Sequence, residues 1–217
     1  MKKDKELQLE VLEELDWDPS VNAENIGVTV TDGVVTLTGD VSSYFEKVAA
    51  EKAVKRVAGV EAVAEELQVK LPALNQRSDS DIARAVVNAL DWNVAVPREL
   101  LDVKVEDGWV TLTGKVDRYY QKMAAEGAVH GLMGVKGISN LITVRPKVTP
   151  AEVTTKIKNT FKRNALLDAE QITVDVLDGK VLLRGRVRSW QEREEAQRAA
   201  SAAPGVCEVE NDLTIIS

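Results

Sequence analysis

Hydrophobic and polar residues follow two different rhythms along this chain, and both rhythms occur three times. Apolar residues first recur at about every fourth position, as at Leu7, Val11 and Leu15. The same spacing returns at Ile82, Val86 and Leu90, and again at Val153, Ile157 and Phe161. Because such spacing places apolar side chains on one side of a helix, each copy predicts an amphipathic helix.

After each helix the rhythm changes to strict alternation, which predicts two strands joined by a tight turn. The clearest example is IGVTVTDGVVTLTGDV at residues 26–41, where apolar and polar residues exchange at every step around an Asp-Gly pair. Asp-Gly between two alternating runs is a strong hairpin signal, since the turn needs positive φ angles that glycine adopts freely. The turn phrase is repeated as DGWVTLTGKV at residues 107–116 and as DGKVLLRGRV at residues 178–187.

The three copies stay in register well beyond this phrase. Gly33, Gly108 and Gly179 are 75 and 71 residues apart, and the same offsets relate two further sets of glycines, namely Gly39, Gly114 and Gly185, and Gly59, Gly134 and Gly205. Agreement over such lengths indicates a duplicated unit. We expect the first of these further sets to lie on the inward side of a strand and to admit a helix close to the sheet. The second should cap a second helix, after which a last strand follows.

Together these signals predict an α+β fold of three tandem αββαβ units, each a three-stranded mixed sheet with two helices packed on one face. The expected domains are residues 1–70, 79–146 and 147–217, with a linker at residues 71–78. Each unit has only about 70 residues, so contacts between units are expected to add to stability. The sequence leaves their arrangement and the oligomeric state open.

Charge adds one distinction between the copies. The chain has 28 Lys and Arg against 35 Asp and Glu, a net charge of −7. Residues 1–70 hold 8 basic and 15 acidic residues, so the excess acidity belongs to the first unit. An acidic chain is a poor match to nucleic acid, and no nucleic-acid partner is expected. With no apolar leader after Met1 and no membrane-spanning run, the sequence predicts a cytoplasmic protein if Met1 is the native start.

Residues for catalysis or metal binding are scarce. His130 is the only histidine and Cys207 the only cysteine, which is too few for a zinc site. His130 is interpreted as a solvated helix residue. Asp32 and its counterparts in the other turns are explained by turn chemistry, and no nucleophile triad or phosphate-binding glycine loop occurs. The sequence therefore predicts no enzyme, no cofactor and no metal site.

One strand carries an unusual row of cations. Arg184, Arg186 and Arg188 alternate along the third unit, and the residues at the same positions of the first unit are Thr38, Asp40 and Ser42. Period-two spacing places the arginines on the uncovered face of the sheet. Two interpretations remain open: the row pairs with Asp175, Asp212 or an acidic neighbouring unit, or it binds an anionic ligand or lipid headgroup.

Aromatic residues also recur. Tyr44, Tyr119 and Trp190 share the first turn of the second helix, and Trp17 and Trp92 share the end of the first. Core packing or a helix staple is expected to explain them. Trp109 is different because it points outward from a strand, which predicts that a neighbouring unit or a partner chain covers that face. Arg184, Arg186, Arg188 and Trp109 are therefore the candidate interaction surface.

The αββαβ order, the Asp-Gly turn, the glycine of TLTG and the Gly-Val before the last strand resemble the BON domain family over almost the whole chain. The resemblance implies a bacterial, non-catalytic protein associated with osmotic or general stress. It also implies binding of phospholipid or interaction with membranes, and one relative with a single such domain binds potassium.

The leading hypothesis is a non-enzymatic adaptor or binding protein of the stress response that holds a phospholipid membrane surface or a protein partner. The alternatives are sensing of K⁺ or another monovalent ion through backbone oxygens, which leave no sequence trace, and a structural scaffold formed by docking between repeats or by a homo-oligomer.

Overall fold

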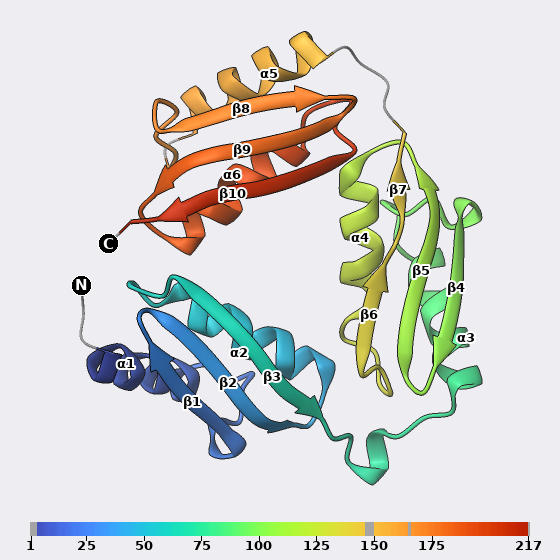
Figure 1. Cartoon of the computed structure of the whole chain (residues 1–217). Helices are drawn as coiled ribbons and strands as arrows, with labels where there is room; N and C mark the ends of the chain where they lie inside the picture. Colours follow the sequence, from blue (N-terminus) through green and yellow to red (C-terminus); the bar gives the residue numbers. More distant parts are fainter. Residues whose placement is uncertain (1–3, 146–149, 165, 217) are drawn as a thin grey trace.

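The computed structural model describes residues 4–145, 150–164 and 166–216, and these form three units of the predicted αββαβ order (Figure 1). The boundary expected between residues 146 and 147 lies outside the described residues. In unit 1 the elements are helix α1 (Asp4–Trp17), strands β1 (Ile26–Thr31) and β2 (Val34–Val41), helix α2 (Tyr44–Arg56) and strand β3 (Ala62–Val69).

Units 2 and 3 repeat this order. Unit 2 consists of α3 (Asp79–Asp91), β4 (Leu101–Glu106), β5 (Trp109–Val116), α4 (Tyr119–Val129), β6 (Gly137–Asn140) and β7 (Thr143–Val144). Unit 3 consists of α5 (Pro150–Arg163), β8 (Ile172–Leu177), β9 (Lys180–Val187), α6 (Trp190–Ser201) and β10 (Glu208–Ile215). Short 3₁₀ turns at Ala23–Asn25, Ala73–Asn75 and Arg98–Leu100 complete the described elements.

Each sheet is mixed, as predicted. The middle strand pairs antiparallel with the first strand of its unit and parallel with the last. The parallel pairing needs a crossover, and the second helix provides it. In unit 2 the last strand was predicted as one continuous segment, but it is divided into β6 and β7 at Leu141 and Ile142.

The three hairpin turns have the expected geometry. Asp32, Asp107 and Asp178 have φ angles of 49°, 50° and 48°, and the glycines that follow them are also positive. Two consecutive residues with positive φ form the turn that best matches the twist of a hairpin, and Asp and Gly tolerate this conformation.

The role predicted for Gly39 and its counterparts was wrong in one respect. A Cβ at Gly39 would overlap the carbonyl oxygen of Asn25, the residue just before β1, and would not meet a helix. Gly185 stands in the same relation to the carbonyl oxygen of Gln171. With φ of 113° at Gly39, the position combines a left-handed backbone with a close main-chain contact.

Each unit has its own hydrophobic core between the sheet and its two helices. In unit 1, Leu7, Val11 and Leu15 of α1 pack with Val35 and Leu37 of β2, and all five are at most 2% exposed. The corresponding residues of units 2 and 3 form equivalent clusters. Burial of these faces provides the main driving force for folding.

The units form a triangle around a common centre (Figure 1). The last strand and second helix of each unit lie toward this centre, whereas the first strand and first helix lie outside. The last strands run in the same sense around the triangle, so the units follow one another head to tail.

Candidate functional site

Contacts between units are made by the three aromatic residues that occupy one equivalent position in the repeats. Tyr44, Tyr119 and Trp190 are the first residues of α2, α4 and α6. Each lies against the unit that follows it around the triangle: Tyr44 against unit 2, Tyr119 against unit 3 and Trp190 against unit 1. The same side-chain position therefore forms all three junctions.

The junction between units 3 and 1 joins segments far apart in the sequence. Trp190 packs against the core of unit 1, and its Nε1 donates a hydrogen bond to the carbonyl oxygen of Val60 at 2.8 Å. The ammonium of Lys55 lies 4.9 Å from the centre of the indole ring, and the guanidinium of Arg193 lies 5.0 Å from it. Cations at this distance are attracted to the ring face.

At the other two junctions the aromatic residue is a tyrosine. Tyr44 packs against the core of unit 2, and burial raises the pKa of its phenol, with Glu126 of unit 2 adding to the effect. Tyr119 interacts with the side chains of Gln197 and Ser201 of unit 3. Burial also raises the pKa of Tyr119, because the phenolate is costly away from water.

The junctions differ in the residue beside the aromatic anchor. Phe45 stacks on His130 at the junction between units 1 and 2, with ring centres 5.7 Å apart. His130 is partly exposed, and the stacked ring of Phe45 is a contact that the sequence did not predict. At the next junction, Tyr120 and Ser201 occupy the positions equivalent to Phe45 and His130, and a hollow of about 570 Å³ opens beside them.

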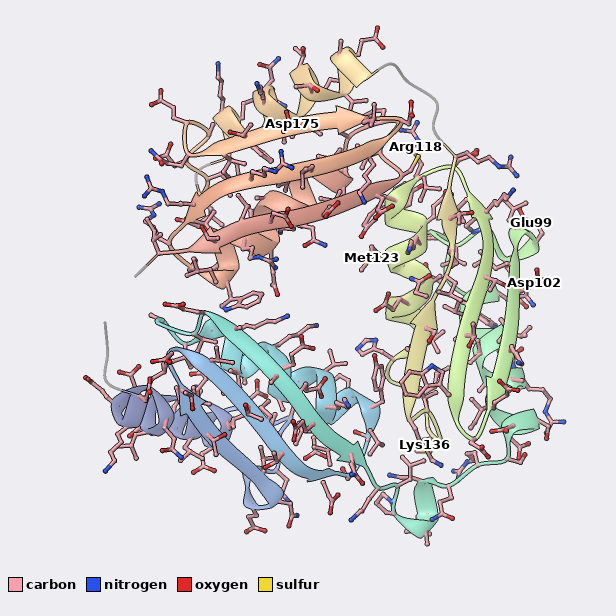
Figure 2. All side chains as sticks on the ribbon, in the orientation of Figure 1. Glu99, Asp102, Arg118, Met123, Lys136 and Asp175 are labelled. Carbon is pink, nitrogen blue, oxygen red and sulfur yellow. The ribbon has the colours of Figure 1, made fainter. Side chains whose placement is uncertain are left out.

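This hollow, which we name the central hollow, is lined by all three units. Met123 projects from α4 toward it (Figure 2), and the other lining residues are Lys55, Tyr119, Tyr120, Trp190, Arg193, Glu194, Gln197, Arg198, Ser201 and Ala202. Tyr120 is 57% exposed and Met123 is 45% exposed. The sequence signal for this place was the repeated aromatic position, which sequence reasoning had assigned to core packing.

The predicted arginine row lies on the uncovered face of unit 3 and the side of α6, and two of its members pair within their own unit. Arg184 lies 3.4 Å from Asp175 on the neighbouring strand β8, which is visible on the near face of the sheet (Figure 2). Arg188 pairs with Glu192 at 2.7 Å. Arg186 is exposed and stands opposite Thr214 in the strand register. Exposed pairs of this kind contribute little to stability.

Trp109 lies apart from this row, in unit 2. Its indole packs on Gly137 of β6, where a Cβ would overlap the ring, and its Nε1 donates to Ser139 Oγ at 2.8 Å. Its own unit covers one side of the indole, and 51% of the residue remains exposed. Cover of the exposed part by a partner chain stays a prediction.

Other groups that can carry chemistry stand alone. The described residues contain no group of three or more His, Cys, Asp or Glu that could hold a metal ion. Burial raises the pKa of the Cys207 thiol, which lies at the junction of units 2 and 3. A thiol with a raised pKa is a poor nucleophile at neutral pH. Within the described part of the chain, no helix is both long and apolar enough to cross a bilayer.

Sequence reasoning missed a second feature at the end of the first helices. Trp17 and Trp92 were expected to take part in core packing or a helix staple, but they are 82% and 89% exposed. Val94, two residues beyond Trp92, is also fully exposed. Trp17 is the last residue of α1, and Trp92 is the residue just after α3. Each ring therefore stands beyond the last helical turn that packs on the sheet.

Comparison with known proteins agrees with this architecture. The profile of the BON domain matches three segments, residues 3–70, 78–146 and 150–217. The osmotically-inducible protein Y of Escherichia coli is 30% identical over 125 residues, which cover 56% of this chain and 62% of that protein. The match thus spans less than two thirds of the relative's length.

Two solved structures of CdsD, a structural protein of the type III secretion system of Chlamydia trachomatis, also match. One is 13% identical over 97% of this chain and 92% of its own length, and the other, the C-terminal domain, is 12% identical over all of both chains. Both have a TM-score of 0.28, which is too low to support any argument about function.

The fold and the junctions define a protein of tandem αββαβ units arranged head to tail around one centre. The profile match covers nearly all of the chain, and the chain belongs to the BON domain family. It consists of three BON domains.

Proposed function

We propose that this protein is a non-enzymatic binding protein of the osmotic stress response that attaches to phospholipid membrane surfaces. The similarity to an osmotically-inducible protein supports the physiological part of the proposal. The binding part is supported by the exposed tryptophans of units 1 and 2.

Trp17 and Trp92 occupy equivalent positions and expose more than four fifths of their surface. Tryptophan is favoured at the boundary between lipid and water, because its ring is apolar and its N–H is polar. In unit 3 the equivalent residue is Arg163, which is exposed and suits a phosphate group.

Sedimentation with vesicles of mixed neutral and anionic phospholipid, at low and at physiological salt, tests this proposal. We expect the protein to sediment with vesicles at low salt and the double variant Trp17→Ala, Trp92→Ala to lose most of this binding. The acidity of unit 1 opposes anionic lipid, so we expect modest affinity. Absence of binding at both salt concentrations would overturn the proposal.

Two further variants determine which surface is used. Trp109→Ala removes an exposed tryptophan from a sheet face, and changing Arg184, Arg186 and Arg188 together to Gln removes the predicted basic row. If the helix-end tryptophans form the contact, both variants bind as the unaltered protein does. Loss of binding in the arginine variant alone would assign the contact to the sheet of unit 3.

The potassium alternative stays a prediction. It is tested by the melting temperature in matched potassium and sodium buffers, which should differ if backbone oxygens hold the ion. Equal melting temperatures would argue against it.

A further inference from the structure

We propose that the central hollow is a binding site for a small amphipathic anion, a molecule with an apolar body and one negatively charged head. The proposal does not depend on attachment to membranes, because the hollow lies between the units and not at the helix ends. A volume of about 570 Å³ falls within the range of small-molecule pockets.

The hollow results from a specific difference between the copies. At the junction of units 1 and 2, Phe45 stacks on His130 beside a smaller hollow of about 240 Å³. At the junction of units 2 and 3, the equivalent of His130 is Ser201, which is too small to meet the ring of Tyr120. With no ring at position 201 to stack on, Tyr120 is 57% exposed at the rim of the central hollow.

The body of the ligand is specified by aromatic and thioether groups. Tyr120 and Met123 of unit 2 line the hollow together with Trp190 of unit 3. Aromatic rings and a flexible Met side chain adapt to apolar ligands of varied shape. Covering Tyr120 and Met123 would also remove apolar surface from water, since both are about half exposed.

The head of the ligand is specified by charge. Among the lining residues, three cations, Lys55, Arg193 and Arg198, face one carboxylate, Glu194. Arg193 donates to the main-chain carbonyl oxygens of Leu213 and Asn211, so its charge is held in place by neutral acceptors. Lys55 is shared between Glu51 at 2.7 Å and Glu194 at 3.9 Å, and Arg198 pairs with Glu195. Because Lys55 and Arg198 already have carboxylate partners, Arg193 is the cation that favours an anionic head over a cationic one.

Calorimetric titration with decanoate, kept below the concentration at which it aggregates and without vesicles present, tests the site. Decyltrimethylammonium has the same chain and a positive head, and we expect it to bind at least about tenfold more weakly. The variant Met123→Glu places a negative charge in the hollow at a half-exposed position, and we expect it to weaken decanoate binding by at least about tenfold.

Met133→Glu is the matched control, because Met133 is also a half-exposed methionine of unit 2 but lies outside the hollow. Met123→Leu should keep the binding, which separates the effect of charge from that of altered packing. Three results would each overturn the proposal: no binding of decanoate, equal binding of the cationic homologue, or equal loss in the two glutamate variants. Failure of vesicle binding leaves these results unaffected, so the two proposals are tested separately.

Discussion

At Gly39 the main chain of β2 passes directly beneath the carbonyl oxygen of Asn25, and no side chain fits between them. A Cβ added at Gly39 would lie far inside normal contact with that oxygen, and the φ of 113° is unfavourable for any other residue. Gly127, in the last turn of α4, has open space around the same position. Replacement by alanine should therefore change the free energy of unfolding in opposite directions at these two glycines.

We expect Gly39→Ala to reduce the free energy of unfolding by about 2 kcal/mol or more, because it combines backbone strain with a clash. Gly127→Ala should raise it by about 0.5–1 kcal/mol, because alanine is the better helix former. Urea denaturation of both variants measures the difference. A Gly39→Ala variant as stable as the unaltered protein would show that the strand shifts freely at this point.

The residue scale is also where the sequence was most informative. Alternation and Asp-Gly predicted the hairpins, and the four-residue spacing predicted the buried faces of the first helices, such as Leu7, Val11 and Leu15. The contact made by Gly39 was harder to predict, because the sequence does not show whether a glycine makes room for a helix or for a carbonyl group. Likewise, exposure of Trp17 depends on where its helix ends relative to the sheet.

At the scale of elements, the start of α2 is fixed by one buried carboxylate. Glu46 is 5% exposed and accepts hydrogen bonds from the backbone N–H of Asn22 at 2.9 Å and of Ser42 at 2.7 Å, and from Ser42 Oγ at 2.6 Å. Its own N–H donates to Ser43 Oγ at 3.1 Å, so Ser43 is the N-cap of the helix. One side chain thus joins the helix start to the segment before β1.

We expect Glu46→Ala to reduce the free energy of unfolding by about 2–4 kcal/mol, because it leaves buried donors without acceptors. Glu46→Gln keeps one acceptor oxygen and should lose less. Thermal denaturation followed by circular dichroism measures both variants. Gln121, the equivalent residue of unit 2, already makes two such bonds as an amide, at 3.1 Å from Asp117 N and 3.0 Å from Arg118 N. An alanine variant no less stable than the glutamine variant would contradict this account.

At the scale of the whole molecule, the triangle depends on a contact between its first and last units. Trp190 is separated from Val60 by 130 positions, and their meeting closes the ring of units. Repeats and linkers in the sequence predicted the units but not this arrangement. The aromatic position was visible when the repeats were compared, yet an aromatic residue in a first turn packs on its own core as readily as on a neighbour.

We expect Trp190→Ala to open the junction between units 3 and 1 and to increase the radius of gyration measured by small-angle X-ray scattering. The lost indole contact is worth about 2–3 kcal/mol. Trp92→Ala is the control, since Trp92 is 89% exposed at the end of a first helix, outside the triangle's junctions. Each unit keeps its own core, so circular dichroism should change little. Identical scattering from the two variants would show that other contacts suffice to hold the triangle.

The tyrosine junctions predict a dependence on alkaline pH. The pKa values of Tyr44 and Tyr119 are raised above their usual 10.0 by burial. A raised pKa means that the neutral phenol is favoured at the junction, so its contribution to stability is complete below pH 10 and is lost as the pH rises through the raised values. The tyrosinate absorbance of these two residues should therefore appear only above pH 10. At the same pH, the radius of gyration measured by small-angle X-ray scattering should increase. Tyr44→Phe and Tyr119→Phe should remove this coincidence, and expansion well below pH 10 would contradict it.

The head-to-tail triangle also sets a limit on self-association. Every unit offers one aromatic anchor and one receiving surface, and closing the chain on itself uses all three of each. A chain opened at Trp190 has one free anchor and one free receiving surface, which match those on any other opened chain. Such contacts are heterologous, so they can propagate from molecule to molecule instead of ending at a dimer. Because units 1 and 3 belong to one chain, unit 3 meets its own unit 1 at a high effective concentration. At moderate protein concentration, unit 3 therefore binds its own unit 1 in preference to that of another molecule.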